Sequence, residues 1–195
     1  MSAAKKLKMS ADEFLLWSLT QEGDYEFANG EIVAMSRDRK GHNVAKGLAF
    51  ASLASAIRRA GLPYTPYTDG VAIKIPAGAI RRPDAAVDCG ETFDPDGLEL
   101  ANPIILVEVV SASSEHTDTS TKLAEYFSIP SVAHYLIVMP LSRMVIHHAR
   151  NADPAGPILT TLRRDGELRH DPPGLVLAVE DLFPPQMREP SPQKM

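Results

Sequence analysis

Two carboxylates occur inside apolar runs, where a charged side chain is unusual. Asp84 follows Pro83 and opens the apolar run 85–87, and Glu108 lies near the end of the apolar run 104–110. A carboxylate taken out of water costs several kcal/mol unless it is paired or coordinates a cation. Two such acids on neighbouring strands therefore predict a shared metal site. The competing interpretation is that each acid only caps a strand end at the surface.

A lysine follows the two acids at a helical position. Asp118, Lys122 and Tyr126 recur at four-residue steps, so they share one face of a helix predicted over residues 119–128. A lysine near a bound metal would be driven toward its neutral form and could orient or deprotonate an attacking water. The alternative is a surface ion pair between Asp118 and Lys122, worth about a few tenths of a kcal/mol.

These residues resemble the PD-(D/E)XK nuclease superfamily, in which an Asp and a Glu on neighbouring strands hold a divalent metal and a Lys assists the attacking water. The superfamily motif places that lysine where this chain has Val110. In the Uma2 family of restriction-endonuclease-like proteins the lysine has moved onto the next helix, and this sequence is identified as resembling that family. The resemblance rests on segments 25–33, 83–84, 107–114 and 134–138 together with Lys122 and Tyr126, and it departs at Ala112, where the family usually has Pro.

The resemblance implies an endonuclease that hydrolyses DNA phosphodiester bonds with Mg²⁺ or Mn²⁺ as cofactor. Asp84, Glu108 and the backbone carbonyl of Val109 would hold the metal, and Lys122 would act on the water. Glu31 would complete the site, with Glu26 as its substitute. His42 and Tyr126 are accessory candidates. Cutting both strands of a duplex also predicts a two-fold homodimer.

Length and composition favour one domain. The chain has 195 residues, of which 10–183 are predicted to form a single domain, with a poorly ordered N-terminus at 1–9 and a flexible Pro-rich tail at 184–195. The single Cys89 cannot form an internal disulfide, so a cytoplasmic location is expected. No apolar run approaches the ~20 residues that a membrane helix needs.

The charge leaves other function classes open. A formal net charge of −5 disfavours nucleic-acid binding, because Lys and Arg supply most non-specific DNA affinity. Arg81, Arg82 and Lys74 are nevertheless weak candidates for DNA contacts, although such residues are more often solvated surface. The alternatives are a non-catalytic binding module on a nuclease fold and a metal-dependent phosphodiesterase acting on a small substrate.

The pattern of elements indicates an α/β (α+β) fold with a restriction-endonuclease-like core. We expect a central mixed sheet in which the Asp84 and Glu108 strands are neighbours, flanked by helices at 41–60 and 119–128 and preceded by an N-terminal helix and a β-hairpin. Ser10 with Glu13 has capping-box spacing, and Asn29-Gly30 suits a type I′ turn. Further strands are expected at 64–67, 71–75, 133–139, 143–148 and 158–162, with a loop at 89–103. His147 and His148 are assigned to structure, because adjacent strand residues point to opposite faces.

Overall fold

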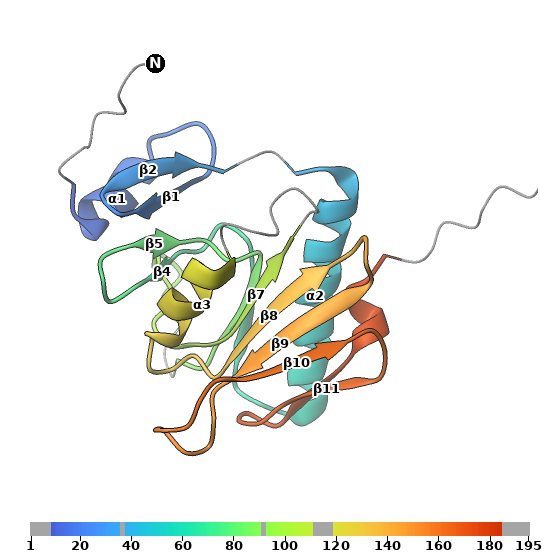
Figure 1. Ribbon diagram of the computed structural model, residues 1–195. Helices are drawn as coiled ribbons and strands as arrows, with labels where there is room; N and C mark the ends of the chain where they lie inside the picture. Colours follow the sequence, from blue (N-terminus) through green and yellow to red (C-terminus); the bar gives the residue numbers. More distant parts are fainter. Residues whose placement is uncertain (1–8, 36–37, 91–92, 111–118, 185–195) are drawn as a thin grey trace, which may run out of the picture.

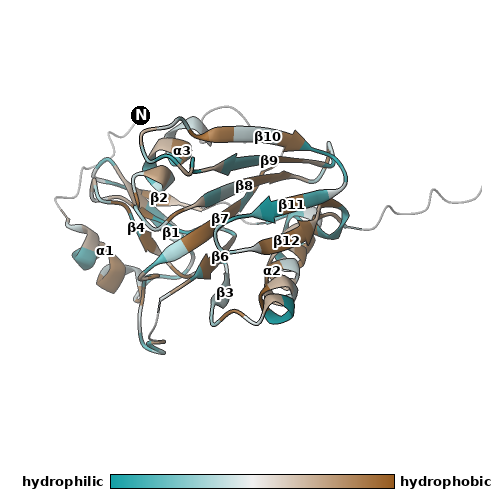
Figure 2. Ribbon diagram, turned by 90° about the horizontal axis from the view of Figure 1, so that it is seen from below, coloured by the Kyte–Doolittle hydropathy of each residue, from teal (hydrophilic) through white to brown (hydrophobic). Residues whose placement is uncertain are grey.

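A six-stranded mixed sheet forms the centre of the molecule. The structure is a computed structural model that describes residues 9–35, 38–90, 93–110 and 119–184. The sheet has the order β10-β9-β8-β7-β6-β3, and Figure 2 shows the strands laid out in that sequence. Only the β7–β8 pairing is parallel within this sheet. Its strands are β3 (Thr65–Thr68), β6 (Ala85–Asp88), β7 (Pro103–Val109), β8 (His134–Met139), β9 (Met144–Ala149) and β10 (Leu159–Arg163).

Strand β6, which follows Asp84, and strand β7, which carries Glu108, are neighbours, as predicted. The two strands pair antiparallel. Ala85 of β6 pairs with Val107 of β7, and every residue of both strands is buried. Alternating side chains serve two cores: Val107 belongs to the core shared with α2 (Lys40–Ala60), and Leu106 to the core shared with α3 (Thr119–Phe127). The two helices therefore cover opposite faces of the sheet (Figure 1).

Helix α2 confirms the long small-residue helix of the sequence prediction, with its start at Lys40. Ala45, Ala49 and Leu53 are completely buried against the sheet, so the small side chains allow close packing. Gly61 ends the helix in the left-handed conformation, with φ of 64°, a geometry that a glycine adopts without the penalty of a Cβ atom.

A smaller sheet beside the central one combines the N-terminal hairpin with two short strands from the segment 73–81. Helix α1 (Ala11–Ser18) has the predicted capping box between Ser10 and Glu13. Strands β1 (Tyr25–Ala28) and β2 (Glu31–Ala34) flank Asn29 and Gly30, both at positive φ, as a type I′ turn requires. The four-stranded sheet has the order β2-β1-β5-β4, where β4 is Ile73–Lys74 and β5 is Ile80–Arg81.

Several short elements differ from the prediction. The strand expected at 71–75 shortens to β4, because a turn closes at once with Gly78 N donating to the Ile75 carbonyl. Strand β5, the hairpin of β11 (Glu167–His170) and β12 (Leu175–Ala178), and the 3₁₀ helix η1 (Val179–Leu182) were not predicted. Leu168 and Leu177 bury this hairpin in the α2-side core.

Some of the predictions fall on residues that the structure does not describe. Asp118, the N-terminal segment 1–8 and most of the tail lie outside the described residues. None of the helices in the described part is both long and apolar enough to cross a membrane.

Candidate functional site

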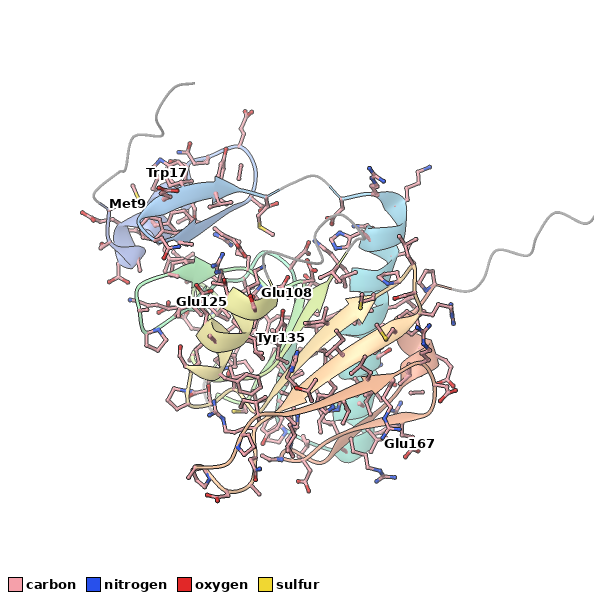
Figure 3. All side chains as sticks on the ribbon, in the orientation of Figure 1. Met9, Trp17, Glu108, Glu125, Tyr135 and Glu167 are labelled. Atoms are coloured by element: carbon pink, nitrogen blue, oxygen red, sulfur yellow. The ribbon has the colours of Figure 1, made fainter. Side chains whose placement is uncertain are left out.

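Asp84 and Glu108 meet where β6 begins and β7 ends. The backbone N–H of Val109 donates to Asp84 Oδ2 at 2.6 Å, so Asp84 is fixed to the residue that follows Glu108. Both acids are buried, at 4% and 8% exposure. Figure 3 shows Glu108 beside α3. Sheet pairing alone therefore brings together two acids that are far apart in the sequence.

Lys122 projects from α3 into this site. Its Nζ atom lies 3.1 Å from Glu108 Oε1 and 3.4 Å from Glu26 Oε1, and the residue is 6% exposed. The hydroxyl of Tyr126, one turn later on α3, donates to the same Oε1 atom at 2.5 Å. Lys122 is thus not the solvated member of a surface ion pair, and the shared helix face of Lys122 and Tyr126 is directed at Glu108.

The hairpin contributes Glu26 to the site, whereas Glu31 lies apart. Glu26 is buried on β1 and approaches Lys122. Glu31 is exposed at the first position of β2, the outer strand of its sheet. Because β1 lies between β2 and β5, it is the inner strand whose acid faces the centre. Glu26, the expected substitute, therefore lies beside Lys122, and Glu31, the first expectation, does not.

Arg81 organises the acids and is not available to DNA. Its guanidinium lies 2.9 Å from Glu26 Oε2 and 2.7 Å from Glu125 Oε2, and it is buried. Two ion pairs to buried or half-buried carboxylates use its donors, so the DNA contact expected for Arg81 does not fit this geometry. Because Arg81 is buried and forms these ion pairs, it is the residue that fixes Glu26 beside Lys122.

The other two DNA-contact candidates are also engaged within the protein. Arg82 is half-buried and donates to the carbonyls of Tyr25 and Gly70 and to the hydroxyl of Ser18. Lys74 is exposed and pairs with Asp12 at 2.5 Å. Lys74 is therefore the candidate among the three whose ammonium remains at the surface.

Lys46 from α2 is a component of the site that the sequence analysis missed. Its Nζ atom lies 2.8 Å from Asp84 Oδ1, 2.9 Å from Asp38 Oδ2 and 3.1 Å from Asp69 Oδ2. Burial lowers the pKa of Lys46, but hydrogen bonds to Asp38 and Asp84 raise it by more, so the side chain stays an ammonium. The sequence holds only an ambiguous signal for it: Asp38, His42 and Lys46 are spaced by four residues, as they also would be on a solvated helix face.

His42 connects the same helix to the end of β7. Its Nδ1 atom lies 2.7 Å from Asp38 Oδ1, and its Nε2 atom lies 2.5 Å from the Val109 carbonyl oxygen and 3.7 Å from Asp84 Oδ2. The pKa of Asp38 is below its usual value, because the hydrogen bonds from Lys46 and His42 outweigh the rise caused by burial. The accessory candidate His42 therefore contacts the carbonyl expected to bind metal.

The electrostatics of the site favour an added cation. Burial raises the pKa of Glu108 to about 7, Lys122 opposes this rise, and the nearby charge of Asp84 adds to it. Burial, together with the charge of Glu108, also raises the pKa of Tyr126 well above its ordinary value, so its hydroxyl remains a donor. Among the described residues, the carboxylates of this network outnumber the basic side chains that contact them, which are Lys46, Lys122, Arg81 and His42. The six carboxylates are Glu26, Asp38, Asp69, Asp84, Glu108 and Glu125.

The donor set fits a hard divalent cation. Asp84, Glu108 and the Val109 carbonyl offer only oxygen atoms, which Mg²⁺ prefers, and Mg²⁺ commonly keeps several waters alongside one or two carboxylates. Within the described residues, no group of three or more His, Cys, Asp or Glu side chains could hold a metal ion. A metal here would therefore depend on two carboxylates, one carbonyl and water.

Comparison with known proteins agrees with this fold. The solved structure from Anabaena variabilis ATCC 29413, titled a "putative nuclease belonging to DUF820", matches with a TM-score of 0.65 at 14% identity, covering 89% of this chain and 97% of that one. An uncharacterized protein of Synechocystis sp., slr1290, is 26% identical over 156 residues, which is 75% of this chain and 76% of the relative. The model of the Uma2 family, described as "Putative restriction endonuclease", matches residues 11–182. The chain therefore belongs to the Uma2 family.

Proposed function

We propose that this protein is a metal-dependent endonuclease that hydrolyses phosphodiester bonds in DNA. The observation that carries the proposal is the 3.1 Å approach of the Lys122 ammonium to Glu108, on the strand end to which Asp84 is bound through the Val109 N–H. The buried Lys122 side chain lies between two carboxylates from other elements, which offset the cost of taking it out of water. Membership of the Uma2 family supports the reaction class.

The contacts of the side chains support a role for each of them in this reaction. Asp84, Glu108 and the Val109 carbonyl would hold Mg²⁺ or Mn²⁺, which supplies charge stabilisation and a more acidic water when bound. Beside a cation held by these ligands, Lys122 would be driven toward its neutral amine, and in that form Nζ would orient the attacking water and accept its proton. Tyr126 fixes the Glu108 carboxylate by donating to Oε1. Arg81 holds Glu26 at the second side of Lys122, so the Lys122 side chain is positioned between Glu26 and Glu108.

Cleavage of supercoiled plasmid in Mg²⁺ or Mn²⁺ tests the proposal. We expect nicked and linear products with the parental protein and none with Asp84→Asn or in excess chelator. Asp165→Asn is the matched control, since it removes an exposed carboxylate in the turn between β10 and β11. Equal cleavage by the parental protein and Asp84→Asn, prepared identically, would show that the activity comes from a contaminant and would contradict the assignment.

The net charge of −5 supports one other substrate class, a small phosphodiester. Such a substrate needs no broad basic surface, whereas DNA does. Chromogenic phosphodiesters of low molecular weight distinguish the two: turnover of these, with plasmid left intact under the same metal concentration, would favour the small substrate. A non-catalytic binding module would leave both substrates unchanged.

We also propose a two-fold homodimer, because cutting both strands of a duplex needs two symmetry-related sites. Multi-angle light scattering of the full chain at micromolar concentration should give twice the 21.2 kDa mass of the chain. A monomer mass under those conditions would remove the dimer while leaving the site unaffected.

A further inference from the structure

Lys46 is a buried cation to which the proposed reaction gives no task. It is 8% exposed, and its nearest carboxylate oxygen belongs to Asp84, at 2.8 Å. Asp84 is also a proposed metal ligand. The ammonium of a lysine is a compact point charge, so it neutralises the negative charge on this oxygen as a metal ion would.

We infer that Lys46 is an internal cation that competes with the divalent metal for Asp84, and that metal binding transfers its ammonium to Asp38 and Asp69. The inference rests on the proposed function, because it requires the metal to bind at Asp84. Lys46 is then a positioning residue: it acts on the reaction only through a metal ligand.

The transfer needs no new partner for the ammonium. A lysine has three N–H donors, and Lys46 already lies 2.9 Å from Asp38 and 3.1 Å from Asp69. Leaving Asp84 therefore costs one contact of three. The other two acceptors persist, and the metal takes over the charge that Lys46 neutralised on Asp84.

The structure also provides space on the side toward which the ammonium would move. A cavity of about 590 Å³ is lined by Asp38, Lys46 and Asp69, and its wall includes Asp24 and Arg82. The side chain of Asp69 is 46% exposed. The ammonium can thus remain bound to Asp38 and Asp69 at the cavity wall. Water reaches it there and offsets part of the free-energy cost of its desolvation.

Competition and simple structural support have opposite consequences for metal affinity. If Lys46 only held the acids in place, its removal would loosen Asp84 and weaken metal binding. If Lys46 competes, its removal frees Asp84 and tightens metal binding, while the metal-free protein becomes less stable because three carboxylates lose their shared cation. Coupling between two binding events of this kind amounts to roughly 5- to 150-fold in affinity.

Calorimetric titration of the full chain with Mn²⁺ measures this directly. We expect Lys46→Met to lower the Kd about tenfold or more, and Lys46→Arg, which keeps the charge, to leave it at or above the parental value. Lys40→Met is the matched control, since Lys40 begins the same helix, is exposed and carries the same charge. Its effect should stay within about twofold, because screened surface charges act weakly.

The outcomes separate the inference from the function. If Asp84→Asn abolishes Mn²⁺ binding while Lys46→Met leaves the Kd unchanged or raises it, the competition is overturned and the metal site stands. Absence of saturable Mn²⁺ binding to the parental protein overturns both. If Lys46→Met does not fold by circular dichroism, Asp69→Asn decides: it removes one alternative acceptor and should raise the Kd several-fold more than Asp24→Asn in the same cavity. An equal effect of the two Asn variants would contradict the inference.

Discussion

The Nζ atom of Lys122 lies 3.1 Å from Oε1 of Glu108, although the two residues belong to a helix and a strand that are separated by a segment outside the described residues. The same oxygen accepts the Tyr126 hydroxyl. One carboxylate oxygen is therefore the meeting point of both α3 side chains. This geometry is the one that a lysine displaced from its strand onto a helix must have in order to act at the site.

Lys122→Ala should reduce the rate of DNA cleavage about a hundredfold or more, as loss of a general base does. Lys122→Arg should fail similarly, because a guanidinium stays protonated and cannot accept a proton. Mn²⁺ binding, measured by calorimetry, should survive in both variants. Parental cleavage rates in single-turnover assays of Lys122→Ala would contradict the role.

The strand pair at the candidate site was predictable because its signals are local. Asp84 and Glu108 stand out as charges at or within apolar runs, and such runs are typical of strands covered on both faces. Lys122 and Tyr126 follow a helical period that can be counted along the chain. Each of these signals needs only residues within a few positions of one another.

The remaining site residues depend on contacts between distant segments. Glu26 and Glu31 lie on the two strands that flank Asn29-Gly30. The pairing of Phe27 with Ile80 distinguishes them, because it makes β1 the inner strand. That pairing spans 53 residues along the chain, and β5 has only two residues with no periodicity of its own. Sequence pattern alone could not choose between the two acids.

Lys46 shows the same limit from another direction. Its four-residue spacing from His42 and Asp38 indicates a common face, but an ordinary solvated face gives the same pattern. The partner that makes it part of the site, Asp84, lies on another element. Burial of a lysine is decided by tertiary packing, and no local signal in α2 announces it.

Glu108→Gln should abolish metal-dependent cleavage while preserving the fold. Gln keeps an oxygen that can accept from Tyr126, but it removes the negative charge that attracts the cation. We expect the circular dichroism spectrum to match that of the parental protein and Mn²⁺ binding to be lost from calorimetric titrations. Tight Mn²⁺ binding by Glu108→Gln would exclude Glu108 as a ligand.

The metal-free stability should depend on pH through Glu108. Its pKa in the folded protein is about 7, raised first by burial, whereas an unfolded Glu titrates near 4.5. The folded state thus binds the proton more tightly, and the stability that this proton contributes is present below pH 4.5 and lost as the pH rises through 7. At pH 7.5 Glu108→Gln should exceed the parental unfolding free energy by on the order of 2–3 kcal/mol.

Urea denaturation in chelator at pH 7.5 and at pH 5 measures this difference. The advantage of Glu108→Gln should shrink at the lower pH, because the parental carboxyl then carries its proton in the folded state. An advantage of equal size at both pH values would show that repacking, and not the charge of Glu108, sets the stability of the variant.

A buried histidine cluster on the α2 side of the sheet predicts the opposite dependence of stability on pH. His134, His147 and His170 come from β8, β9 and β11, with ring centroids 4.9–5.1 Å apart. Burial, together with the neighbouring histidines, lowers the pKa of His147 to about 4 and that of His170 well below its ordinary value. The rings are therefore neutral in the folded protein at neutral pH.

A lowered pKa means that the unfolded state binds protons first, so stability present above pH 6.5 is lost as the pH falls toward 4. His170→Leu removes the fully buried member of the cluster. We expect the unfolding free energy of the variant to fall less steeply between pH 7.5 and pH 5 than that of the parental protein, because one site of proton uptake on unfolding is gone. The comparison at pH 7.5, where the rings are neutral in both states, isolates the change in packing. Parallel curves for the two proteins over this range would show that His170 does not contribute to the acid sensitivity.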